Sequence, residues 1–595
     1  MNRRLYAVCF CAFLFLLPLK FGNPIVLESL TSIPRGGWDW LLSMWPNQLA
    51  ILVALVLVAS SVWTPNGFAR VSPRAFWLPC AFLATQLAAM PLSVSPQVSL
   101  DTVVMFAAGL GAYALAIHKF AESRNDHWPY TILLAATVII CSVTIQQYFG
   151  GLQETRDFFH EHFREQDVNS DYLIKLGGDR PFGTFVYPNS LAGYLVLLLP
   201  VLVARIWQLR ESWEHSAVWV VLVGFVGLVL FCLVLSGSKG GFLTLGAVVV
   251  IVTAFVRMPK RMKLILLVLL VVCGGAFAVR YGPKIVSYGL STSSARIDYW
   301  RAGLRIFADH PWLGAGPGTF GTVYPKYKLY TSEDPRLTHN NFLEALSDSG
   351  IFGFAAYAAL WLAPMAIALR RLRRSDDSML IGLTLSLAAW IVHGLIDFDQ
   401  YIPSLAFLAF FFLGRLEVKL EPQTSAPAPP IPLRLGVTLL ALLLCVLPVT
   451  RLIGGSYFQE ARMLTEANPF AATKAIQSAI HFAPLDPLYH SEASRIEQKR
   501  GNVEAATLSL ARARMLDPYR SNFAWEIAML IRANQGLTVD YFKAAEQAVA
   551  LAPKNPRYRE TLAQDYATLG LTEAAAEHAN ALNEIERHLH PQASN

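Results

Sequence analysis

Residues 338–353 read THNNFLEALSDSGIFG and place a histidine and two asparagines directly ahead of an apolar run. The run extends to about residue 369, which is long enough to cross the roughly 30 Å hydrocarbon core of a bilayer as a helix. The stretch therefore predicts the mouth of a membrane helix with polar residues gathered at it. His339 is a candidate general base there, because imidazole titrates near neutral pH, although a histidine at a helix start is more often a cap.

The composition of the whole chain is that of a polytopic membrane protein. Of its 595 residues 54% are hydrophobic and only 15% are charged, whereas soluble domains carry about 25% charged residues. The net charge of +7 is modest, and most of the basic excess lies in short loops, so we interpret it as a topology signal and not as nucleic-acid binding. The seven cysteines lie inside apolar runs, which predicts no disulfide framework.

Thirteen apolar runs are candidate membrane helices, and two of them, near 241 and 401, are short. The first run follows Arg3 and Arg4 and lacks a small-residue cleavage pattern, so an uncleaved helix is favoured over a secretory signal. The runs centre on 5–20, 47–63, 76–92, 101–118, 128–147, 189–205, 216–235, 241–257, 263–280, 350–369, 379–396, 401–415 and 433–451.

Basic residues alternate with the predicted helices along the chain. Arg3 and Arg4 predict a cytoplasmic N-terminus, and every second loop is then basic. The basic loops carry Arg70 and Arg74, Lys119 and Arg124, Arg205 and Arg210, Arg257 to Lys263, Arg370 to Arg374, and Arg415 with Lys419. The opposite side of the membrane receives 148–188, 236–241, the long loop 281–340, 393–400 and the tail.

The tail after residue 452 changes to an Ala- and Glu-rich helical pattern. Three similar segments recur, HFAPLDPLY, RMLDPYRSNF and ALAPKNPRY, with their prolines 34 and 35 residues apart. That is the tetratricopeptide period, with the hairpin turns predicted at Gly501, Gly536 and Gly570. Stacked hairpins of this kind present a concave surface to a protein or glycan partner, although a bare helical cap is the alternative. A proline-rich spacer, 422–432, precedes the last membrane helix.

Two cationic residues stand at tight, glycine-rich entries to membrane helices on the side opposite the basic loops. Arg180 begins RPFGTFVYPNSLAGYL, in which Asn189 is the expected helix N-cap, and Lys239 lies in the turn SGSKGG. An arginine beside free helix N–H groups is suited to hold a phosphate. The alternatives are an arginine at lipid headgroups and a simple hairpin.

The long loop and the turn after it supply further ionisable residues. Residues 295–310, ARIDYWRAGLRIFADH, predict a surface helix with Arg296 and Arg301 on different faces and an apolar stripe that includes Ile297 and Leu304. In HGLIDFDQYIP, His393 and Asp397 are four residues apart and are expected to pair. Asp397 and Asp399 also form a D-x-D pattern, a weak indication of a metal.

Together, several cations, a histidine and acidic residues on one membrane face favour transfer from a lipid-linked phosphate or pyrophosphate. Cations stabilise the leaving pyrophosphate, and a base takes the proton of an attacking hydroxyl.

The chain resembles the bacterial O-antigen ligases and their relatives, the lipid-linked-glycan polymerases and protein O-oligosaccharyltransferases. That family has His, then Asn, Ser or Gln, nine residues, Gly, two residues, then Gly, Thr or Tyr, which His339, Asn340, Gly350 and Gly353 satisfy. The segments GTFVYPNSLAGYL, ARIDYWRAGL and HPWLGAGPGTF also look like the family's. The resemblance covers residues of about 170–410.

The resemblance implies a metal-independent, inverting glycosyltransferase without a cofactor. Its donor would be an undecaprenyl-pyrophosphate-linked glycan and its acceptor a hydroxyl on lipid A-core, a growing polymer or a protein. Carried over, His339 activates the acceptor, and Arg180 and Arg296 bind pyrophosphate, with Lys239 or Arg301 as further candidates. Lys239 departs from the family, in which arginine is common at this position and offers a bidentate fork.

We therefore expect an all-α, multi-pass inner-membrane protein with about 12–13 transmembrane helices, followed by a tetratricopeptide-type solenoid. Residues 1–452 form the membrane domain, and 453–595 form the periplasmic repeats. A transporter is disfavoured because no inverted repeat and no mid-membrane ionisable residues are seen. A scaffold built around the repeats leaves the other helices unexplained. A metal-using oligosaccharyltransferase needs an acidic motif in its first outer loop, where only Glu28 and Asp39 occur.

Overall fold

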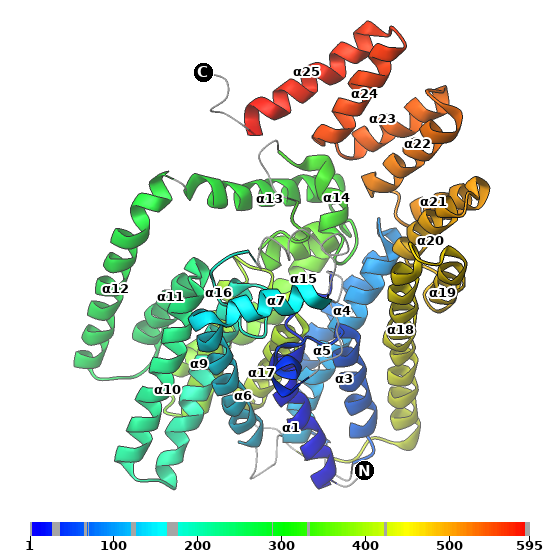
Figure 1. Ribbon diagram of the computed structural model, residues 1–595. Helices are drawn as coiled ribbons and strands as arrows, with labels where there is room; N and C mark the ends of the chain where they lie inside the picture. Colours follow the sequence, from blue (N-terminus) through cyan, green and yellow to red (C-terminus); the bar gives the residue numbers. More distant parts are fainter. Residues whose placement is uncertain are drawn as a thin grey trace.

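The computed structural model describes residues 3–26, 36–64, 68–69, 71–120, 127–162, 177–287, 289–329, 334–421 and 425–589. It consists of a large helical bundle and a curved row of shorter helices that rises from one end of it (Figure 1). In the described part of the chain the only strands are β1 (Phe68–Ala69) and β2 (Ser425–Ala426), which pair with each other. The predicted all-α fold is confirmed.

Each of the thirteen predicted spans overlaps a helix, although the helix in the span predicted over 379–396 ends three residues earlier, at His393. Seven helical spans among the described residues are long and apolar enough to cross a membrane, and three helices are apolar but shorter. The chain is therefore a multi-pass membrane protein. The helices of the thirteen spans are α1 (Arg3–Lys20), α3 (Asn47–Ser61), α4 (Pro73–Ala89), α5 (Pro96–Phe120), α6 (Trp128–Gln146), α9 (Pro188–Gln208), α10 (His215–Ser236), α11 (Lys239–Phe255), α12 (Lys260–Ser287), α15 (Asn341–Leu372), α16 (Ser378–His393), α17 (Pro403–Leu420) and α18 (Ile431–Leu464).

The centre of the bundle is formed by α9 and α17, which are apolar on every side. Most residues of α9 and nearly all residues of α17 are buried, which is typical of helices that other helices surround. Small residues let α5 approach α17 closely: a Cβ added at Gly109 would lie 2.6 Å from the Phe410 ring. Arg415 is also buried there, where it donates to the Tyr130 hydroxyl at 3.3 Å and the Ala116 carbonyl at 3.4 Å.

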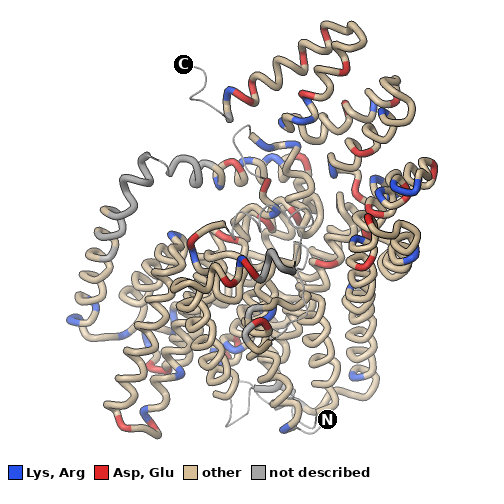
Figure 2. Tube along the Cα trace, in the orientation of Figure 1, with Lys and Arg blue, Asp and Glu red and all other residues tan. Residues whose placement is uncertain are grey.

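The loops predicted to be basic meet at one end of the bundle. Strands β1 and β2 join the loop after α3 to the loop after α17. Arg74 makes an ion pair of 2.6 Å with Glu417, and Lys419 makes one of 2.9 Å with Asp377. Figure 2 shows Lys and Arg at the lower ends of several bundle helices, the end that also holds the N-terminus. The alternating charge pattern therefore corresponds to one physical end.

At the opposite end, shorter elements cover the helix mouths. They are α2 (Gly37–Leu42), η1 (Met90–Leu92), η2 (Gln147–Gly151), α7 (Leu152–His162), α13 (Gly289–Asp309), α14 (Phe320–Tyr327) and η5 (Asp399–Tyr401), while η4 (Leu209–Glu211) caps α9. The predicted surface helix is α13. It packs into the protein through Tyr299, Ala302 and Ile306, whereas Ile297 and Leu304 of the predicted stripe are exposed.

Helix α15 is broken at Gly350, which has φ +62° and ψ −164°. The segment that follows α13 crosses the helix at this break. The Ile351 amide donates to the Pro311 carbonyl at 2.9 Å, and the Ala315 amide donates to the Ser347 carbonyl at 2.9 Å. A Cβ at Gly350 would lie 2.3 Å from the carbonyl carbon of Trp312. Only glycine fits this backbone conformation and this approach.

The tail forms the predicted row of helical hairpins. Gly501, Gly536 and Gly570 stand at three of the turns with φ between +72° and +76°, as the repeat pattern predicts. Helix α18 runs without interruption past residue 452, so the bundle and the repeats share it. The repeat helices are α19 (Pro469–Phe482), α20 (Pro487–Lys499), α21 (Val503–Leu516), α22 (Ser521–Gln535), α23 (Val539–Leu551), α24 (Pro556–Thr568) and α25 (Thr572–Leu589).

The break in α15 leads to a stability prediction. We expect Gly350→Ala to destabilise the protein by at least about 1–3 kcal/mol, the cost of a strained backbone conformation, with the steric clash in addition. Thermal unfolding in detergent measures the change. Gly436→Ala in α18 is the matched control, because its added Cβ meets nothing within 4 Å. Equal unfolding temperatures for the two variants would contradict the packing argument.

Candidate active site

His339 is held in an unusual backbone conformation by the start of α15. Among the described residues it alone, apart from glycines, has a positive φ, of +54°. The flanking residues fix it from both sides. Asn340 is the N-cap, and its side chain accepts hydrogen bonds from the Phe342 and Leu343 amides at 3.0 and 3.1 Å. The Thr338 amide donates to the Glu344 carboxylate at 2.5 Å. A residue that its neighbours hold in a strained backbone conformation is typical of a functional site.

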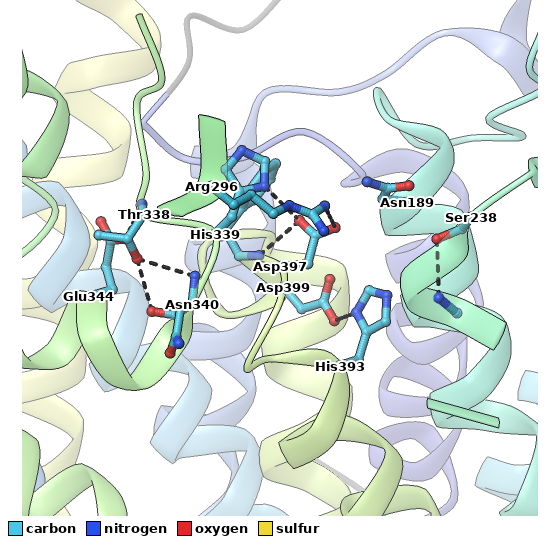
Figure 3. Close-up of polar contacts among 12 residues, drawn as sticks. Asn189, Ser238, Arg296, Thr338, His339, Asn340, Glu344, His393, Asp397 and Asp399 are labelled. Atoms are coloured by element: carbon cyan, nitrogen blue, oxygen red, sulfur yellow. Dashed lines mark hydrogen bonds and ion pairs between the residues drawn. The ribbon is translucent and has the colours of Figure 1, made fainter. Parts of the chain in front are cut away.

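The His339 side chain meets an acidic and a cationic partner (Figure 3). Its Nδ1 lies 3.4 Å from Oδ1 of Asp397, and Nη2 of Arg296 lies 4.0 Å from Oδ2 of the same carboxylate. Asp397 is buried, whereas His339 and Arg296 keep 24% and 30% of their side chains exposed. Because Nδ1 faces the carboxylate, Nε2 is the nitrogen available to a bound molecule.

Asp397 is suited to stay ionised between these partners. Burial alone would raise the pKa of its carboxyl, but the contact with His339 and the charges of His393 and Arg296 lower that pKa below its ordinary value. The Phe398 amide also donates to its Oδ1 at 2.9 Å. The pairing therefore persists at neutral pH.

The expected pair of His393 with Asp397 is wrong. Helix α16 ends at His393, so Asp397 lies on no helical face with it. His393 Nδ1 instead lies 2.6 Å from Oδ2 of Asp399, and both side chains are buried. The two carboxylates of the D-x-D pattern thus serve different histidines. Gly193 makes room for the second pair, since a Cβ there would lie 2.8 Å from both Asp399 oxygens.

Arg180 lies across the turn between α10 and α11. Its Nε donates to the Ser236 carbonyl at 2.7 Å, and its Nη2 donates to the Asn189 side-chain oxygen at 2.9 Å. The expected N-cap role of Asn189 is wrong, because Pro188 occupies the first helical position and Tyr187 is the N-cap. Asn189 orients the guanidinium instead.

The α10–α11 turn connects the Arg180 group to the histidine pairs. A Cβ at Gly237 would lie 3.3 Å from Arg180 Nε, and one at Gly240 would lie 3.6 Å from His393 Nε2. Ser238 caps α11 by accepting from the Gly241 amide at 3.2 Å. The contacts therefore run from Arg180 through this turn to His393 and Asp399, which lies two residues from Asp397.

The two remaining cationic candidates differ in position. Lys239 is exposed at the first residue of α11, within the turn that Arg180 contacts. Arg301 is 63% exposed and lies 3.6 Å from Asp298, one turn along α13 from Arg296. Of Arg296 and Arg301, only Arg296 has an ion pair with the His339–Asp397 pair among the described residues.

Two residues that the sequence did not single out support the site. Gln147 accepts from the Phe182 and Gly183 amides at 3.0 and 2.8 Å and donates to the Gly183 carbonyl at 2.9 Å, which fixes the Arg180 loop. Tyr299 places its ring 5.8 Å from the His339 ring. The one sequence feature that could have identified Gln147 is its position at the end of an apolar helix. No sequence feature identified Tyr299.

The fold and the site define a multi-pass membrane protein with a cation-bearing histidine site at one end of its helix bundle. Residues 224–358 match the model of the O-Antigen ligase family. The match includes the α10–α11 turn, Arg296 and the His339 motif.

Two further similarities cover smaller parts of the chain. An uncharacterized protein of Haemophilus influenzae is 28% identical over 176 residues, which are 25% of this chain and 44% of that protein. The match therefore spans less than half of that relative's length. The crystal structure of MamA protein aligns with 27% of this chain and 86% of its own, with 11% identity and a TM-score of 0.22.

The Arg180 loop provides a test of the site geometry. We expect Gln147→Leu to speed hydrogen exchange of the Phe182 and Gly183 amides by about tenfold to a hundredfold, because a buried unpaired N–H costs about 1–3 kcal/mol. Mass spectrometry of the detergent-solubilised protein measures this exchange. Gln146→Leu is the control, since Gln146 bonds to Glu154 outside the loop. Unchanged exchange in Gln147→Leu would show that other contacts fix the loop.

Proposed function

We propose that this protein transfers a glycan from undecaprenyl pyrophosphate to an acceptor hydroxyl at the periplasmic face of the bacterial inner membrane. The basic loops then lie in the cytoplasm, and the end that bears His339 and the repeats lies in the periplasm. The proposal rests on one observation above all. A partly exposed histidine with an ionised carboxylate beside it lies near Arg296, at the mouths of membrane helices in a chain whose residues 224–358 match the O-Antigen ligase family.

In the proposed reaction the acceptor oxygen attacks the anomeric carbon of the first sugar. The bond between that carbon and the pyrophosphate oxygen breaks, and the configuration inverts. His339 Nε2 takes the proton of the hydroxyl, while the Asp397 carboxylate, 3.4 Å from Nδ1, stabilises the imidazolium that forms. The histidine is therefore oriented by a group that is already charged.

The departing pyrophosphate gains negative charge and needs cationic partners. Arg296 lies beside the histidine pair, and Arg180 and Lys239 lie at the α10–α11 turn, where α11 presents its N-terminal amides. We assign donor binding to these three residues. Asn189 and Asn340 act by orienting Arg180 and by fixing the start of α15. Arg301 has the weaker case, because its contact is with Asp298.

The acceptor that we favour is lipid A-core, as in an O-antigen ligase. Polymerisation of a glycan and transfer to a protein use the same chemistry and differ in which hydroxyl enters. Offering the purified protein each acceptor in turn distinguishes the three reactions.

Arg296 and Arg301, both on α13, give a matched pair of variants for the transfer assay. With lipid-pyrophosphate glycan as donor, we expect His339→Ala to lower kcat by about 10²–10⁴-fold. Arg296→Ala should lower it by about 10²-fold or more, because a preorganised partner of the leaving charge is lost. Arg301→Ala, on the same helix, should stay near the wild-type rate. Wild-type rates for both His339→Ala and Arg180→Ala would overturn the site assignment.

Metal independence is tested separately. We expect a chelator such as EDTA to leave the transfer rate unchanged, because the proposed base and cations are side chains. The control is readdition of Mg²⁺ or Mn²⁺ to the treated protein. Activity that the chelator abolishes and a divalent ion restores would refute this part of the proposal.

A further inference from the structure

The repeat domain contacts the rest of the protein through the three segments that recur in the sequence. Each of them forms the turn between one hairpin and the next. In the first, Asp486 bonds to Arg451, and Nη2 of Arg451 lies 3.2 Å from Asp101 at the start of α5. The first recurring turn therefore contacts the membrane domain in addition to capping a helix.

The second turn lies against the segment that carries the site. Asp517 is fully buried and bonds to Arg520 at 3.0 Å. Burial raises the pKa of its carboxyl, and the nearby charges of Arg520 and Arg336 oppose the rise. Arg336 stands three residues before His339. Tyr519 packs against the apolar cluster that contains Tyr299 and Tyr324.

The third turn continues the same line of contact along α13. Burial and the charge of Arg305 lower the pKa of Lys554, while Glu584 and Asp298 act in the opposite direction. Helix α23 contacts α14, and Figure 1 shows the repeats passing over α13 and α14. One edge of the solenoid is therefore docked at three successive turns.

Of the three turns, the second is connected to the proposed catalytic histidine, His339, by a short series of side-chain contacts. The Tyr299 ring lies 5.8 Å from the Tyr324 ring in an edge-on arrangement and 5.8 Å from the His339 ring. The chain before His339 is also close to α14, since a Cβ at Gly321 would lie 2.8 Å from the Arg336 Cα. Tyr519 supports the cluster behind both contacts.

We propose that the turn at 517–519 of the repeat domain is a positioning part of the active site. Tyr519 supports the cluster that contains Tyr299 against His339, and the charge of Asp517 attracts Arg336 on the segment that leads into the strained histidine. The repeat domain then helps to position the active site and is not a separable cap. A histidine with φ +54° needs support from its surroundings. Loss of the contacts made by the 517–519 turn would therefore let His339 leave this backbone conformation.

This inference rests on the proposed function of His339, and the test separates the two. In the full-length protein, Tyr519→Ala is expected to lower kcat by about tenfold to a hundredfold, the effect of a small misplacement of a catalytic group. The KM for the lipid-pyrophosphate donor should change little, and Tyr519→Phe should restore kcat. Hydrogen exchange of amides 336–341 should be faster in Tyr519→Ala, a readout that needs no activity.

Tyr566→Ala is the matched control, because this half-buried repeat tyrosine stacks on Phe542 within the solenoid. It should leave kcat and the exchange of amides 336–341 unchanged. A wild-type kcat in Tyr519→Ala beside an inactive His339→Ala overturns this inference alone, whereas an active His339→Ala overturns the function. If Tyr519→Ala does not fold, Asp517→Asn replaces it, and an unchanged kcat there has the same meaning.

Discussion

The close approach of two backbones at Gly350 is the constraint on which the site depends. It lets the segment after α13 cross α15, where Ile351 and Ala315 exchange hydrogen bonds with Pro311 and Ser347. The crossing fixes α13, which carries Arg296, relative to the helix that begins just after His339. Packing therefore explains why a glycine, Gly350, stands eleven residues after His339. Arg296 and His339, which we propose act in the reaction, come from distant parts of the long loop and keep their distance because Gly350 lacks a side chain.

Buried charge is the second organising element. Asp397 and Asp399 are both buried, and each has a histidine partner. A buried carboxylate without a partner is costly, so each pair stabilises the turn between α16 and α17 as well as serving the chemistry. Glycines in α9 and α11 leave space for this turn. The arrangement brings the Arg180 group and the His339 group together from helices far apart in the sequence.

Much of this protein could be predicted from its sequence, and the limits have physical causes. Apolar runs and alternating loop charge predicted the helices, and the recurring proline segments with the glycines between them predicted the repeat turns. The pairing of His393 with Asp397 was wrong because helical spacing was applied beyond the end of a helix. The sequence left open which of Arg296 and Arg301 contacts the donor, since only packing decides which face of α13 meets His339. Tyr299 and Gln147 act through contacts that no local pattern records.

Helix α18 has 34 residues and would extend about 51 Å at 1.5 Å per residue. A bilayer core is about 30 Å thick, so roughly two fifths of the helix stands clear of it. The repeats begin on that projecting part and are joined to the bundle by covalent helix and not by a flexible tether. The length of this projecting part therefore sets the distance between the repeats and the lipid surface. Whatever molecule meets them must do so at one fixed distance from the headgroups.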